Sequence, residues 1–237
     1  MAFLNNQFVI ALLLGIVPSL LWLRFWMRED DINPPPSKLI FITFFIGMAM
    51  VIVVLPMEKF FHDHISNAQY LTVIWAGLEE LVKLAAVLLI TLGSNDIDEP
   101  VDFPIFFMAS ALGFAALENT LFILHPVTSH STTVSLLTGN LRFLGATLLH
   151  ATASAVIGIS LGLVFFKDKI SKFFAVIVGI IIATALHSVF NFFIIDSNGK
   201  DFFKIFGFLW IITIIIMLLF EKLRRMSTAM YETETVS

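Results

Sequence analysis

Seven stretches of this chain are long and apolar enough to cross a lipid bilayer as helices, and no other feature constrains its fold as strongly. They lie near residues 7–26, 38–55, 70–92, 103–124, 141–165, 173–195 and 203–220. About 20 helical residues cover a hydrocarbon core of ~30 Å. The composition agrees, because 58% of the residues are hydrophobic and only 14% are charged, whereas about a quarter of the residues in soluble domains are charged.

We therefore expect an all-α protein, a polytopic integral membrane helical bundle with about seven transmembrane helices and no soluble domain. Residues 1–226 are predicted to form a single transmembrane domain, followed by a polar C-terminal tail over 227–237 without regular structure. No positive charge precedes the first apolar stretch and no small-residue cleavage site follows it, which indicates an uncleaved anchor. Cysteine is absent, so disulfides and cysteine-based zinc sites are excluded.

The basic residues predict the orientation of the chain in the membrane. With the N-terminus outside, nine Lys and Arg residues next to the spans face the cytoplasm and four face outward, as counted on the sequence. Cytoplasmic loops carry an excess of basic residues. We therefore predict an outside N-terminus and a cytoplasmic C-terminus.

Polar side chains inside the apolar stretches are concentrated in four consecutive spans. Ionisable groups at that depth are costly, so each is a candidate functional residue. From their distances to the span ends, the carboxylates and imidazoles lie roughly 9–14 Å below the same membrane face. The candidates are Glu79, Glu80 and Lys83 in the third span, Glu118 and Asn119 in the fourth, His150 and Ser154 in the fifth, and His187 and Asn191 in the sixth.

The helix faces favour convergence of these groups. His150 and His187 each lie on a helix face on which glycine and alanine recur at four-residue spacing. Small residues at that spacing let transmembrane helices pack closely. Lys83 follows Glu79 by four residues, the favourable order for an ion pair on a helix. We interpret Lys83 mainly as a structural partner of a glutamate, and Asn119 and Ser154 as supporting residues.

Two carboxylates and two imidazoles at one buried level suit the activation of water, and two versions remain open. In the first, Glu118, His150 and His187 bind zinc and leave a coordination position open. Glu79 or Glu80 is then the general base. In the second, a desolvated glutamate activates water without a metal, while a histidine and Asn191 stabilise the oxyanion.

The motifs Glu79-Glu80-Leu-Val-Lys83, Phe114-Ala-Ala-Leu-Glu118-Asn119, His150 and His187-Ser-Val-Phe-Asn191 stand in this order in successive spans. In order and placement they resemble the PrsW family of bacterial intramembrane proteases, which is related to the CAAX-protease and bacteriocin-processing superfamily. The resemblance covers residues 70–195. CAAX enzymes usually have histidine where Glu118 stands and arginine where Lys83 stands, which disfavours the processing of prenylated proteins.

The resemblance implies an intramembrane endopeptidase in the bacterial cell (inner) membrane. Its substrate would be a membrane-tethered protein such as an anti-sigma factor, and its other contact the lipid bilayer, with no nucleic acid. Glu79, Glu80 and His187 would be catalytic, and Glu118 and His150 would complete the site. A proton-coupled transporter or sensor that uses the same carboxylates is the alternative, although the paired repeats common in transporters are absent from the sequence. A structural scaffold is a third interpretation.

Overall fold

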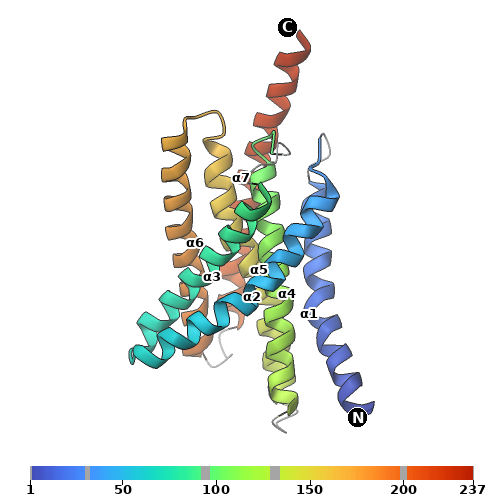
Figure 1. Ribbon diagram of the computed structural model, residues 1–237, viewed down its shortest axis with the longest axis vertical. Coiled ribbons are helices and arrows are strands. Elements are labelled where there is room, and N and C mark those ends of the chain that lie inside the picture. Colours follow the sequence, from blue (N-terminus) through green and yellow to red (C-terminus); the bar gives the residue numbers. More distant parts are fainter. Residues whose placement is uncertain (1, 30–32, 92–96, 129–133, 198–201, 237) are drawn as a thin grey trace.

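The computed structural model in Figure 1 describes residues 2–29, 33–91, 97–128, 134–197 and 202–236, and within these ranges every regular element is an α-helix. Their bounds are α1 Ala2–Arg28, α2 Ser37–His64, α3 Ala68–Thr91, α4 Asp102–Thr128, α5 Val134–Leu163, α6 Lys169–Ser197 and α7 Phe202–Val236. The prediction of an all-α polytopic bundle is confirmed.

Six of these helices are long and apolar enough to span a membrane, and α3 is the exception. It has 24 residues, but Glu79, Glu80 and Lys83 interrupt its apolar sequence. Helices follow one another in alternating directions, so that the two termini lie at opposite ends of the bundle (Figure 1). The prediction of about seven spans is therefore supported by length and composition for six helices. The seventh, α3, is more polar and packs among them.

Helix α4 occupies the centre of the bundle. It packs against α1, α2 and α5, while α5 in turn contacts α6 and α7, and α3 lies against α2 and α6. Nearly every side chain from Val101 to Ala116 is buried, as expected for a helix that is apolar all round. The outer helices instead expose large apolar side chains, including Ile52 on α2, Ile181 on α6 and Leu218 on α7. This outer surface is suited to lipid.

Glycines allow the central helices to approach one another closely. A Cβ atom on Gly113 of α4 would collide with the backbone carbonyl of Phe44 on α2, and one on Gly47 of α2 would collide with the carbonyl of Ser110. On α6, a Cβ on Gly179 would lie 2.8 Å from Cα of Ile157 on α5. Small residues at helix crossings let membrane helices pack closely, and here they bring α2 against α4 and α6 against α5.

Two helix starts are fixed by side-chain caps. The side-chain oxygen of Asn67 accepts hydrogen bonds from the backbone N–H groups of Gln69 (2.9 Å) and Tyr70 (3.0 Å) at the start of α3. Asp168 caps α6 in the same way through Ser171. The hydrogen bonds from the Ser171 hydroxyl and backbone hold the pKa of Asp168, which lies outside the spans, below its ordinary value. Such caps satisfy N–H groups that have no partner within the helix.

Helix α2 is longer than the sequence predicted. It continues past the expected end at residue 55, through Pro56, to His64. Residues Val51 and Val54 are buried, and Glu58 follows them at the same helical spacing. Glu58 therefore belongs to the helical bundle and not to an external loop.

The predicted end of the last helix and the unstructured tail over 227–237 are wrong, because α7 continues to Val236. Leu223 and Ser227 are buried against the bundle, and Glu221 pairs with Arg224 and Arg225 one turn on. No glycine or proline occurs after Gly207 to stop the helix. Residue 237 lies outside the described residues.

Substitution of Gly113 by valine will destabilise the bundle, because the added side chain must displace the α2 backbone at Phe44. Overpacking of this kind costs about 1–3 kcal/mol. Thermal unfolding of the purified protein in detergent measures the loss. Gly207→Ala is the matched control, since a Cβ on Gly207 meets nothing within 4 Å and alanine favours a helix. Equal unfolding temperatures for the two variants would contradict the packing argument.

Candidate active site

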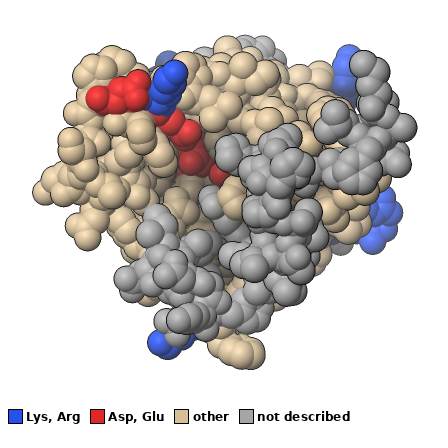
Figure 2. Space-filling view, turned by 90° about the horizontal axis from the view of Figure 1, so that it is seen from below, with Lys and Arg blue, Asp and Glu red and all other residues tan. Residues whose placement is uncertain are grey.

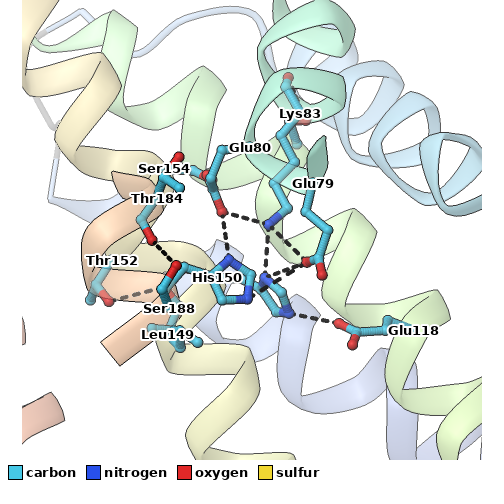
Figure 3. A network of polar contacts seen from close by, with 12 residues as sticks. Glu79, Glu80, Lys83, Glu118, Leu149, His150, Thr152, Ser154, Thr184 and Ser188 are labelled. Atoms are coloured by element: carbon cyan, nitrogen blue, oxygen red, sulfur yellow. Dashed lines mark hydrogen bonds and ion pairs between the residues drawn. The ribbon is translucent and has the colours of Figure 1, made fainter. Parts of the chain in front are cut away.

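The site is built on one turn of α3 that turns its charged side chains inward. Glu80 and Lys83 are fully buried and Glu79 is 8% exposed. Lys83 follows Glu79 by four positions and Glu80 by three, so the three side chains lie on neighbouring parts of one helix face. The charges thus point at α4, α5 and α6 instead of at lipid (Figure 3).

Glu80 is the most fully bonded group in the site. Its Oε1 lies 2.8 Å from Lys83 Nζ and 3.1 Å from Nδ1 of His187, and its Oε2 accepts a hydrogen bond of 2.6 Å from the Ser154 hydroxyl. These partners come from α3, α6 and α5. Glu80 has no contact with the cavity described below, so its geometry is that of a residue which positions others.

Hydrogen bonds determine which nitrogen of each histidine carries a proton. An ammonium can only donate, so Nδ1 of His150, 2.8 Å from Lys83 Nζ, is an acceptor. Its Nε2 therefore donates to Glu118 Oε2 at 2.7 Å. His187 donates from Nδ1 to the Glu80 carboxylate, which leaves its Nε2 with a free lone pair. The two rings meet edge to face at 4.9 Å.

Glu79 contributes a weakly bonded carboxylate oxygen to the site. Its Oε2 is buried and makes no hydrogen bond within the described residues. It lies 3.7 Å from Nε2 of His187, 3.8 Å from Nδ1 of His150 and 3.7 Å from Lys83 Nζ. A buried polar atom without a partner is rare and calls for a physical explanation. The position of this oxygen, between two unprotonated imidazole nitrogens, is that of a ligand or a proton acceptor.

A cavity of about 180 Å³ opens beside these groups. Its polar lining consists of Glu58, Glu79, Glu118, His150, His187, Asn191 and Trp75, and its apolar lining includes Val51, Val54, Phe114 and Phe190. Figure 2 shows acidic side chains along a hollow at the end of the bundle where α1 begins. The cavity is large enough for water and a short extended stretch of peptide.

A metal ion fits one part of this arrangement. Ligand atoms of Glu79, His150 and His187 lie within 4.8 Å of one another, and all three residues are buried. The other nitrogen of each histidine donates to a carboxylate, Glu118 for His150 and Glu80 for His187, which is the usual support of metal-binding histidines. Coordination through His150 Nδ1 requires Lys83 to release that nitrogen and keep Glu80.

The sequence-predicted residues are brought together, with one exception. Hydrogen bonds and ion pairs join Glu79, Glu80, Lys83, Glu118, His150, Ser154 and His187 into one network, and Asn191 lines the cavity. Asn119 instead donates to the Thr147 hydroxyl at 3.0 Å and ties α4 to α5. The group that could hold a metal differs from the predicted Glu118, His150 and His187, because Glu79 takes the place of Glu118.

Glu58, the carboxylate that α2 contributes to the cavity, was not among the residues predicted from the sequence. The predicted span ended three residues before it. The signal was the spacing of Val51, Val54 and Glu58, which place one helix face toward the bundle. The indole N–H of Trp75 donates to the backbone carbonyl of Glu58 at 3.1 Å, which fixes this end of α2 against α3.

Fold and site together define a polytopic helical membrane protein with a buried carboxylate–imidazole centre, of the kind that hydrolytic membrane enzymes require. The model of the PrsW family of intramembrane metalloproteases matches residues 35–220. The chain belongs to this family and is an intramembrane protease. This membership favours the enzyme over the transporter and scaffold interpretations.

Two relatives are proteins named Protease PrsW. The one from Bacillus subtilis (strain 168) is 20% identical over 201 residues, which cover 83% of this chain and 88% of the relative. The one from Geobacillus kaustophilus (strain HTA426) is 26% identical over 113 residues, 46% of this chain and 50% of that relative. No solved structure matches the chain.

Lys83→Met will strongly destabilise the protein, because it leaves the Glu80 carboxylate buried without its cation. Breaking a buried ion pair from one side costs about 3–5 kcal/mol. The double variant Lys83→Met/Glu80→Gln should recover part of this loss. Unfolding free energies of the wild type, both single variants and the double variant test the coupling. Strictly additive losses would show that the pair is not a unit.

Proposed function

We propose that this chain hydrolyses a peptide bond of a membrane-tethered protein with water, at a metal centre held by Glu79, His150 and His187. The observation that carries the proposal is the unbonded Glu79 Oε2 beside the unprotonated nitrogens of two histidines, each supported by a carboxylate. A zinc ion held there would supply the Lewis acidity that polarises a peptide carbonyl and makes water acidic enough to attack it near neutral pH.

The remaining side chains have separable roles in this proposal. Glu80 orients His187 and neutralises Lys83, and Ser154 keeps Glu80 in place. Glu118 lies on the cavity wall with its side chain 34% exposed and in contact with His150. Its hydrogen bond to Nε2 places it on the side of the His150 ring away from Nδ1, so through one bridging water it can accept a proton from the attacking water and return it to the departing amine nitrogen. Relative to the sequence interpretation, Glu79 and Glu118 exchange the roles of ligand and base.

Asn191 is proposed to stabilise the oxyanion that forms on the peptide carbonyl. It lies on the cavity wall one helical turn after His187, and its side-chain amide can donate two hydrogen bonds. Donors aimed at developing negative charge are among the largest contributors to catalysis in a low-dielectric site. The apolar walls at Phe114 and Phe190 limit the access of other water.

The proposed setting follows from the spans and the basic residues. We place the protein in a bacterial cell membrane with its N-terminus outside, residues 70–195 as the catalytic unit within one transmembrane domain, and a single-span protein such as an anti-sigma factor as substrate. A prenylated substrate is not favoured, because Glu118 and Lys83 depart from the residues usual in CAAX enzymes.

Metal analysis of the purified full-length protein tests the ligand set directly. We expect about one zinc per chain, lost on Glu79→Gln, His150→Ala or His187→Ala and kept in Asp63→Asn, an exposed carboxylate on α2. Removal by a chelator should abolish cleavage of a single-span substrate, and added zinc should restore it. A metal-free preparation with full activity would instead establish direct activation of water by a glutamate.

Glu118→Gln separates the base from the ligands. The amide keeps the size and position of the side chain but accepts no proton, so kcat should fall about 10²–10⁴-fold, the usual contribution of a general base. Metal content should stay near that of the wild type. Mass spectrometry of cleavage products measures kcat, and elemental analysis measures the metal. Unchanged kcat, or loss of metal with the activity, would contradict this assignment.

A further inference from the structure

The cavity contains more carboxyl groups than the reaction described above requires. Glu58, Glu79 and Glu118 all line it, whereas no lysine or arginine does so among the described residues. Lys83 is bonded to Glu80 and His150 and lies 4.6 Å from the Phe114 ring centroid. Its single charge is matched by the buried Glu80.

Glu58 is the carboxylate that the proposed chemistry leaves unused. It is half-buried, and no hydrogen bond or ion pair engages its carboxylate within the described part of the chain. Glu79 and Glu118 line the same cavity. The backbone of Glu58 is nevertheless held firmly by Trp75. A carboxylate on a well-anchored part of the cavity wall, with a second carboxylate lining the same cavity, suits a positively charged side chain.

A second feature shows that the cavity is built for a ligand. Oε2 of Glu79, whose side chain is 90% buried, lines the same cavity and has no hydrogen-bond partner among the described residues. The walls on the α2 side are apolar, formed by Val51, Val54 and Leu55. Long basic side chains combine an apolar stem with a charged end, and this wall matches both parts.

We propose that Glu58, together with Glu118, forms a subsite that binds a lysine or arginine side chain of the substrate close to the scissile bond. The inference rests on the proposed peptidase function and adds a preference to it. The methylene stem lies along the α2 wall, and the charged end pairs with Glu58. Glu118 faces the same end while it stays in contact with His150. Binding of the basic residue would therefore place the neighbouring peptide bond at Glu79 and the histidines.

The experiment uses the full-length protein in liposomes and one single-span substrate whose cleavage site has been mapped by mass spectrometry. Each of the three residues on either side of the cleaved bond is replaced in turn by lysine, methionine or glutamate. At one position we expect kcat/KM for lysine to exceed that for methionine roughly tenfold, a typical effect of a charged hydrogen bond, with glutamate poorer still.

Variants of Glu58 connect this preference to the structure. Glu58→Gln should bring the ratio of lysine to methionine close to one, and Glu58→Lys should make the glutamate substrate the better one. Asp63→Asn is the matched control, because this carboxylate on the same helix is exposed and outside the cavity, and it should keep the wild-type ratio. Thermal unfolding of each variant verifies that it is folded.

A binding measurement keeps the subsite testable apart from catalysis. Glu79→Gln protein is titrated with fluorescent lysine and methionine versions of the substrate, and anisotropy should show the same preference, lost on adding Glu58→Gln. Equal cleavage and equal binding of all versions would overturn the subsite, as would a Glu58→Gln variant that keeps the ratio. Selective binding without any cleavage would overturn the proposed peptidase function and leave the subsite standing.

Discussion

The buried ion pair between Glu80 and Lys83 is the interaction on which the rest of the site depends. Charges inside lipid are costly unless they are paired and fully hydrogen-bonded. Glu80 meets that condition with three donors drawn from α3, α5 and α6. Those helices must therefore stay at fixed separation, and the glycines at their crossings allow it. The pair thus orders the helices that carry the histidines.

Two adjacent glutamates have opposite environments for a simple geometric reason. Successive residues on an α-helix point about 100° apart, so Glu80 faces Ser154 and His187 while Glu79 faces the cavity. The first is saturated with hydrogen bonds, and the second has an oxygen with none. Sequence position makes them equivalent, but their surroundings make one a positioning group and the other a candidate ligand.

The helical bundle could be predicted from the sequence, because membrane-spanning helices are recognised by their length and their apolar composition. The convergence of Glu79, Glu118, His150 and His187 was predicted from their depth and from the helix faces on which they lie. The hydrogen-bond partners of each residue could not be predicted. Whether Glu79 or Glu118 lies beside the unprotonated nitrogens of the two histidines depends on the rotation and tilt of the helices. Glu58 was missed for a related reason. Pro56 and the charges after it resemble the end of a span, yet Trp75 and the α3 contact keep α2 helical.

The dimensions of the cavity constrain how any substrate enters it. An intact helix with its side chains is about 10–12 Å wide, whereas the cavity beside Glu79 has a volume of only about 180 Å³. In the proposed reaction, a transmembrane substrate must therefore unwind locally before its backbone reaches Glu79. Unwinding exposes amide groups that lipid cannot hydrogen-bond, which confines the scissile segment to the polar cavity or to the end of a span. An acidic wall that pairs with a basic side chain would help to hold such an unwound segment in place.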